Sequence, residues 1–171
     1  MNGANCLDDL FAHQGTGFRC KMCGNCCELD VLMTEHDLKR IEARFPNQVA
    51  KTERIRRMGK IAGGRLYSPL FAGADSRVHC IFLEGNSCSV HEAKPLLCAL
   101  YPFFPIPIDR VRKFTSGQPG LASVKSSDGT SYLISVDQDC KGVSMSAPPV
   151  DWVSIVRLWE QFEAESAEEI T

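Results

Sequence analysis

Residues 18–30 read FRCKMCGNCCELD, and four cysteines lie within this short stretch. Two residues separate each of Cys20, Cys23 and Cys26 from the next, and Cys27 follows Cys26 directly. Such a concentration of thiols is typical of a metal site, a disulfide framework, a redox relay or a catalytic nucleophile. The rest of the chain has to distinguish among these four chemistries, because the structure around residues 18–30 depends on which of them applies.

The composition argues against a disulfide framework. The chain has 171 residues, 44% of them hydrophobic, which is enough for one domain with a core that needs no cross-links. The segment MNGANCLDDLFAHQG has acidic residues where a signal peptide is apolar, so we expect a cytoplasmic protein with reduced thiols. Nine cysteines cannot all pair within one chain. The net charge of −2 indicates neither a nucleic-acid nor a membrane partner.

The spacing of the cysteines predicts a metal site. Two residues between thiolates let both sulfurs converge on one ion, and further thiols must come from elsewhere in the chain. The candidate ligands are Cys20, Cys23, Cys26, Cys27, Cys80, Cys88, Cys98 and Cys140. Four thiolates suit Zn²⁺ and equally an iron–sulfur cluster such as 4Fe–4S. The spacing from Cys20 to Cys26 matches the first three ligands of a bacterial ferredoxin, but its continuation is absent, so both metals stay open.

Three features of the cysteines leave alternatives open. In an extended stretch Cys26 and Cys27 would point to opposite faces, so we expect either two sites or one spare thiol. A catalytic thiol would need a base, for which His79 and His91 are candidates by proximity, although surface or core histidines are commoner. His91 could instead complete a Cys₃His site. Cys6 stands alone and is best interpreted as an inert packed thiol.

The pattern predicts a small single α+β domain, irregular around the cysteines, with short hairpins and an amphipathic C-terminal helix. We expect an N-terminal extension at 1–17 and the metal-chelating domain at 18–171. Thr34 is the expected N-cap of the first helix. The expected helices cover 32–46, 47–64, the first part of 91–107, and 150–169; the expected strands and hairpins cover 65–71, 80–90, 111–117 and 123–136.

Three segments together resemble the YkgJ-type cysteine cluster proteins, the CxxCxxCC zinc- or iron-chelating domain family. They are FRCKMCGNCC at 18–27, CIFLEGNSCSVHEAKPLLCALYPF at 80–103 and DQDCKGV at 137–143. The segment KPLLCALYPF is similar to the family pattern R-P-x-x-C-R-x-F/Y-P, with Lys94 and Ala99 where arginines are typical. The resemblance covers every cysteine except Cys6. It implies chelation of zinc or iron without naming a reaction.

Three functions follow as hypotheses. The first is a protein that binds zinc or an iron–sulfur cluster through its cysteines. The second is a cluster-dependent enzyme that modifies a protein substrate, because flagellin lysine N-methylase has a similar cysteine domain; the chain lacks the glycine-rich turn of Rossmann methyltransferases. The third is a structural zinc module that docks a protein partner through LYPFFPIPI at 100–108. None of the three requires a nucleic acid or a membrane.

Overall fold

The computed structural model describes residues 10–58, 60–62, 65–68, 71–72, 78–115 and 121–168. The chain divides into two compact units. Unit 1 consists of Met1–Lys21 and Leu100–Glu160, and unit 2 consists of Met22–Ala99 and Gln161–Thr171. The mixture of short sheets with helices confirms the predicted α+β class. The boundary at residues 17 and 18 stays a prediction.

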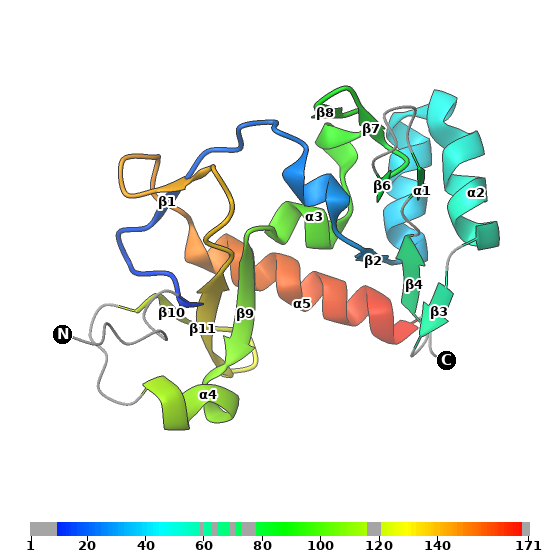
Figure 1. The fold of residues 1–171 in the computed structure, drawn as a ribbon. Coiled ribbons are helices and arrows are strands. Elements are labelled where there is room, and N and C mark those ends of the chain that lie inside the picture. The colour runs from blue at the N-terminus through cyan, green and yellow to red at the C-terminus, as the bar shows by residue number, and fades with distance from the viewer. Residues whose placement is uncertain are drawn as a thin grey trace. The chain divides into compact units, whose positions relative to one another are not determined.

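Unit 1 is built on a three-stranded antiparallel sheet in the order β10–β11–β9, which Figure 1 shows beside α4. Asp128-Gly129 marks the turn of the predicted β10–β11 hairpin, and Gly129 has a φ of 88°. A second, two-stranded ladder joins β1 to β12. The bounds are β1 Gly17–Phe18, β9 Phe103–Pro107, α4 Ile108–Thr115, β10 Ser123–Lys125, β11 Ser131–Val136 and β12 Val143–Ser144.

Aromatic side chains form the core of unit 1. The Phe103 ring meets the Trp152 ring edge to face at 5.1 Å and the Phe18 ring at 5.6 Å, measured between ring centroids. Trp152 and Val156 are buried on one face of α5 (Trp152–Glu168), which confirms the predicted C-terminal amphipathic helix. The burial of Phe103 and the pairing of β9 with β11 weigh against 100–108 as a free docking strand.

The predicted strand at 111–117 is wrong over residues 111–115, because α4 covers Ile108–Thr115, and residues 116 and 117 lie outside the described residues. Ile108 and Val111 are spaced as on one helix face, and both pack against the cluster that contains Phe11 and Leu133. Asp109 lies in the first turn, where a carboxylate stabilises a helix dipole. Val111 is therefore an apolar residue at helical spacing.

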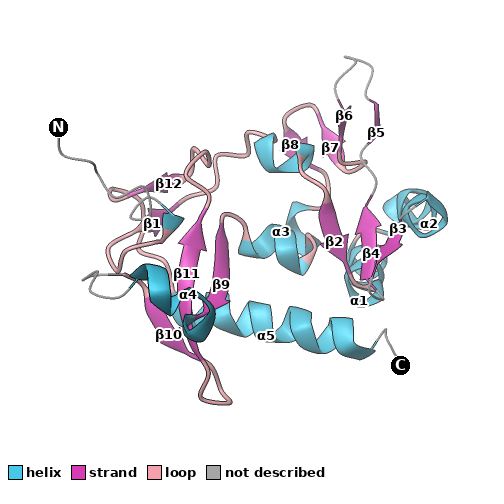
Figure 2. Cartoon of the chain, turned by 60° about the horizontal axis from the view of Figure 1, so that its bottom comes forward, coloured by secondary structure: helices cyan, strands magenta, loops and turns pink. Residues whose placement is uncertain are grey.

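Unit 2 includes the helices α1 and α2 and a three-stranded antiparallel sheet in the order β2–β4–β3 (Figure 2). The Thr34 side chain accepts from the Asp37 N–H and the Asp37 side chain accepts from the Thr34 N–H, which confirms the predicted N-cap. The predicted second helix is too long, since α2 ends at Met58 and a strand begins at Lys60; Gly63 and Gly64 lie outside the described residues. The bounds are β2 Val31–Met33, α1 Glu35–Arg44, η3 Pro46–Gln48, α2 Val49–Met58, β3 Lys60–Ala62, β4 Arg65–Ser68, β5 Phe71–Ala72 and β6 Val78–His79.

The unit 2 cysteines lie in or next to short elements. These elements are η2 Asn25–Glu28, β7 Leu83–Glu84, β8 Ser87–Cys88, η4 His91–Ala93 and α3 Leu96–Leu100. The predicted hairpin is present as β7–β8, with Gly85 at a φ of 62° in its turn. Cys88 lies on the second strand of this hairpin, whereas Cys80 lies just before the first strand. The hydrophobic core of unit 2 includes Cys80 with Phe82 and Val90, so one cysteine is part of that core.

Candidate metal centre

The adjacent cysteines lie in a 3₁₀ helix rather than in an extended stretch. Met22 and Gly24 have positive φ angles of 53° and 76°, and the turn that they form leads into η2, which contains both Cys26 and Cys27. The Cys27 N–H donates to the Gly24 carbonyl at 2.8 Å. The premise that an extended backbone separates the two thiols is therefore wrong, because the turn at Gly24 winds the chain before it reaches them.

The Cys26 and Cys27 thiols interact with each other. The Cys27 side chain donates a hydrogen bond to the Cys26 sulfur, which lowers the pKa of Cys26 to about 6. Lys94 adds a smaller electrostatic contribution in the same direction. The same hydrogen bond holds the proton on Cys27 and raises its pKa far above the ordinary value. The hydrogen bond thus makes the first proton of the pair easier to remove and the second harder to remove.

Main-chain hydrogen bonding brings a third cysteine to this pair. The Cys80 N–H donates to the Cys27 carbonyl at 2.7 Å, and the Cys80 carbonyl accepts from the Leu83 N–H at 3.0 Å. Cys80 therefore connects η2 to the start of the β7–β8 hairpin. Its side chain is only 9% exposed, and this burial raises the pKa of the Cys80 thiol to about 11.

Cys88 and Cys98 complete a group within unit 2. Both side chains are partly buried, and burial raises the pKa of each thiol, that of Cys98 well above its ordinary value. Cys98 interacts electrostatically with Cys80, Cys26 and Cys88, and Cys27 interacts with Cys26, Cys80 and Cys88. We call these residues the five-cysteine group: Cys26, Cys27, Cys80, Cys88 and Cys98.

The other predicted ligands are Cys20, Cys23 and Cys140. Cys23 is exposed in unit 2, whereas Cys20 and Cys140 belong to unit 1. The Arg19 N–H donates to the Gly142 carbonyl at 3.0 Å, which continues the β1–β12 ladder to the residue before Cys20. A side chain at Gly142 would place its Cβ 2.6 Å from the Arg19 carbonyl oxygen, so this approach requires glycine. The ladder places the segments that contain Cys20 and Cys140 next to each other.

The two candidate histidines differ in their surroundings. The Nδ1 atom of His79 lies 3.0 Å from the carbonyl oxygen of Cys80, a hydrogen-bonding contact with the backbone rather than with a thiol. Burial lowers the pKa of His91, and the neighbouring Lys94 lowers it further. His91 is therefore neutral at pH 7, the form in which imidazole binds a metal. Its role as a base or as a ligand stays a prediction.

Two lysines and one aspartate near the group interact electrostatically with its thiols. Lys94 lowers the pKa of Cys26 and Cys88 electrostatically, and Lys51 acts in the same direction on Cys80 and Cys88. The Asp37 carboxylate lies close enough to Cys98 to raise its pKa. Only Lys94 had a sequence signal, its position in the segment KPLLC. Lys51 and Asp37 come from α2 and α1, which are distant in sequence, and no motif marks either residue.

The chemistry of the donors fits a thiophilic metal. Four thiolates suit both tetrahedral zinc and an iron–sulfur cluster, and the five-cysteine group offers more than four. Among the described residues, no three His, Cys, Asp or Glu side chains are arranged to hold a metal ion as they stand. The assignment of individual ligands stays a prediction.

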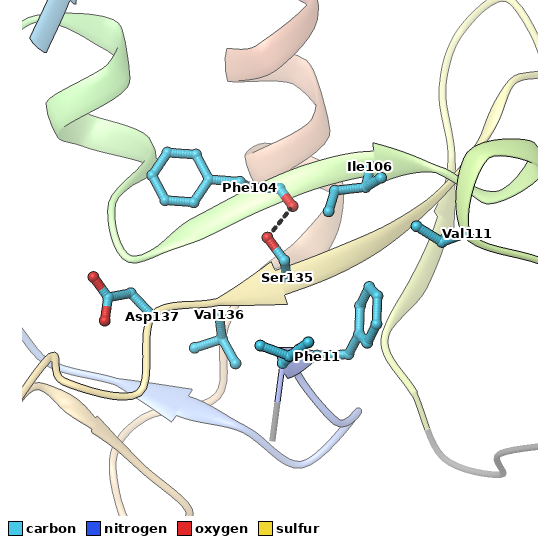
Figure 3. A pocket seen from close by; sticks show the side chains of 8 residues that line it. Phe11, Phe104, Ile106, Val111, Ser135, Val136 and Asp137 are labelled. Atoms are coloured by element: carbon cyan, nitrogen blue, oxygen red, sulfur yellow. Dashed lines mark hydrogen bonds between the residues drawn. The ribbon is translucent and has the colours of Figure 1, made fainter. Parts of the chain in front are cut away.

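A separate pocket of about 400 Å³ lies within unit 1 (Figure 3). Its lining is largely apolar, with Phe11, Ile106 and Val136 among the contributing side chains. Ser135 also lines it, but the hydroxyl donates to the Phe104 carbonyl at 3.1 Å and is already satisfied (Figure 3). No cysteine is among the residues that line this pocket. It therefore does not contribute to the candidate metal centre.

The clustered thiols define the class of the protein as a cysteine-rich chelating domain. A model of the CxxCxxCC family, described as "putative zinc- or iron-chelating domain", matches residues 19–141. The chain belongs to this family, and the resemblance noted in the sequence is confirmed. No curated protein and no solved structure matches the chain. In the part of the chain that the structure describes, no helix is both long and apolar enough to span a membrane.

Proposed function

We propose that this protein holds zinc or an iron–sulfur cluster through four thiolates of the five-cysteine group. The observation that supports this most is the electrostatic interaction among thiols from three separate segments within one unit: η2, the residues around the β7–β8 hairpin, and α3. A chain of this size does not need a thiol cluster in order to fold stably. A bound zinc ion or iron–sulfur cluster, in contrast, needs several thiolates close together.

The protonation states of the group suit a site that fills by exchanging protons for a metal. The hydrogen bond from Cys27 lowers the pKa of Cys26, which favours a thiolate at this position. Cys80, Cys88 and Cys98 keep their protons, because burial raises the pKa of each. These thiols lose their protons only when a cation compensates the cost of burying the negative charge. Loading should therefore release protons into solution.

Metal and sulfide analysis of anaerobically purified protein tests the proposal. Iron with an equivalent amount of acid-labile sulfide and a visible absorption band would identify a cluster. Zinc in a colourless protein would identify a zinc site. A folded protein that contains no metal, and takes up neither Zn²⁺ nor iron with sulfide on reconstitution, would contradict the proposal. Cys6→Ser is the matched control, because Cys6 lies outside the family pattern.

A second candidate, a cluster-dependent enzyme that modifies a protein side chain, is supported by the surplus thiol. Five cysteines exceed the four positions of a tetrahedral site, so one thiol would remain free beside the metal. We would test this enzyme by adding S-adenosylmethionine to the reduced, cluster-containing protein. An unchanged electron paramagnetic resonance spectrum would remove the support for methyl transfer. The cytoplasmic location, a protein partner and the ligand roles of Cys20, Cys23 and Cys140 stay predictions.

A further inference from the structure

A carboxylate outside the cysteine pattern contacts the helix that bears Cys98. Asp37 lies on α1, and its side chain is completely buried. The Oδ1 atom accepts a hydrogen bond from the backbone N–H of Leu96 at 2.9 Å. Leu96 is the first residue of α3, and Cys98 follows two residues later. Asp37 thus caps the helix of a candidate ligand from a distant part of the sequence.

The other contacts of Asp37 fix its carboxylate in place. Its Oδ2 atom accepts from the Thr34 N–H at 3.0 Å, and Arg40 pairs with Oδ1. Arg40 also binds Glu165 near the end of α5, with 2.6 Å between Nη1 and Oε1, and the Thr34 hydroxyl donates to Glu165 at 2.9 Å. Both carboxylate oxygens of Asp37 are therefore held by donors from fixed elements, so the position of the Leu96 N–H is fixed as well.

The intrinsic stability of α3 does not account for the hydrogen bond between Asp37 and its first N–H. The helix α3 has only five residues, and Pro95 precedes it. So short a helix has little stability of its own, and its placement depends on contacts with its surroundings. Buried carboxylates are costly, and this one is paired with a main-chain donor close to a candidate ligand. Outer partners of this kind hold metal ligands in position in other proteins.

We propose that Asp37 is a positioning residue for Cys98, which it holds in the metal site through the Leu96 N–H. This inference rests on the proposed metal-binding function. Asp37 itself does not ligate the metal. Its loss should displace Cys98 and weaken binding, while the remaining thiolates keep their places.

Asp37→Asn gives the first test. An amide offers one acceptor atom where the carboxylate offers two, so the side chain of this variant cannot accept from both Thr34 and Leu96. We expect Co²⁺, used as a spectroscopic probe, to bind about tenfold more weakly than to the wild-type protein. The thiolate-to-cobalt charge-transfer absorption per bound ion should fall by about a quarter if one of four thiolates is lost. Glu42→Gln is the matched control, because Glu42 is another α1 carboxylate and its partners are Arg56 and Thr52.

A second pair of variants isolates the hydrogen bond without altering Asp37. Leu96→Pro removes the N–H at a position where helices accept proline, the first residue. Leu96→Ala keeps the N–H and removes more of the buried side chain. We expect Leu96→Pro to weaken Co²⁺ binding about tenfold more than Leu96→Ala does. This pair decides the question if Asp37→Asn fails to fold.

The outcomes separate the two proposals. If the wild-type protein takes up neither Co²⁺ nor Zn²⁺ nor iron with sulfide, the metal-binding function itself is contradicted. If the wild-type protein binds Co²⁺ and Leu96→Pro binds it as tightly as Leu96→Ala, only the positioning role of Asp37 is overturned. Equal losses of Co²⁺ affinity in Asp37→Asn and Glu42→Gln would also overturn the positioning role of Asp37.

Discussion

The backbone N–H of Cys80 donates to the carbonyl oxygen of Cys27 at 2.7 Å, so main-chain atoms alone join these two candidate ligands. The two residues lie far apart in sequence, and closing the loop between them costs entropy. This bond, together with the burial of Cys80 in the cluster that contains Phe82, offsets part of that entropy. Main-chain bonding and core packing therefore hold these two candidate ligands in neighbouring segments.

Cys80→Ala should separate metal binding from folding. The substitution keeps the backbone N–H and removes only the sulfur, so the metal-free protein should retain its circular dichroism spectrum. Zn²⁺ affinity should fall by about tenfold or more, because one thiolate is lost. Competition with a zinc chelator measures this loss. An unfolded metal-free variant would show instead that the thiol itself is needed for the fold.

Metal content should differ between Cys98→Ser and Cys140→Ser. Cys98 belongs to the five-cysteine group, whereas Cys140 lies in unit 1. We expect Cys98→Ser to lose the metal of the five-cysteine group and Cys140→Ser to keep it. If the chain has a second site, the wild-type protein will contain more metal than Cys140→Ser. Loss of all metal from Cys140→Ser would contradict a site formed within unit 2 alone.

Lys94→Gln should shift the pH at which the site loads. Lys94 lowers the pKa of Cys26 and Cys88, so its removal raises both values and leaves less thiolate at a given pH. The pH of half-maximal Zn²⁺ loading should therefore move upward, and affinity at pH 7 should fall about two- to fivefold. Lys94→Arg preserves the charge and should behave as the wild-type protein. An equal loss of Zn²⁺ affinity in Lys94→Gln and Lys94→Arg would show that the packing of the lysine side chain, and not its charge, is the cause.

Two glycines with positive φ allow a comparison of local strain at the site with strain elsewhere. Gly24 has a φ of 76°, and a Cβ there would lie 3.2 Å from Leu83, whereas a Cβ at Gly129 would meet nothing within 4 Å. Alanine at either position should lower the free energy of unfolding by about 1–2 kcal/mol. Only Gly24→Ala should also weaken metal binding, because that turn orients Cys26 and Cys27. Urea unfolding and a Zn²⁺ titration of both variants check this.

The Glu42–Arg56 pair should make stability fall in acid. Hydrogen bonds from Arg56 and Thr52 lower the pKa of Glu42 from its ordinary value of 4.5. The unfolded chain regains that ordinary value, so it binds more protons than the folded chain between the two values. The stabilisation is present above about pH 4.5 and disappears as the pH falls through the folded-state pKa.

Urea unfolding of the wild-type protein and of Glu42→Gln at several pH values measures this effect. The wild-type protein should be the more stable of the two at pH 7, and the difference should shrink as the pH falls below about 4.5. A difference that does not change with pH would assign the effect to packing.

The local parts of the fold and site could be predicted from the sequence. Thr34 as a cap and the apolar stripe from Trp152 to Phe162 depend on neighbours within a few residues. The spacing of the cysteines likewise indicated the family. The α4 segment was predicted wrongly because Val111 suits a strand as well as a helix face, and only its packing against the Phe11 cluster decides between them.

The non-local parts of the site could not be predicted. The pairing of Cys80 with Cys27 and of Asp37 with Leu96 joins residues that no sequence period relates. The contrast between Cys26 and Cys27 depends on a hydrogen bond between their side chains, and that bond forms only because the chain turns at Gly24. A sequence pattern shows which thiols exist, whereas the folded backbone decides which of them meet.

The burial of Cys80 among core side chains also bears on how long a bound metal would stay. A chelator competes for the metal ion, and a thiolate that is 9% exposed is displaced from the ion most readily when the surrounding core opens. The residence time of the metal would then follow the rate of local opening rather than the strength of each sulfur–metal bond. Exchange of the metal between proteins would be slow in the folded state and rapid once this part of unit 2 opens.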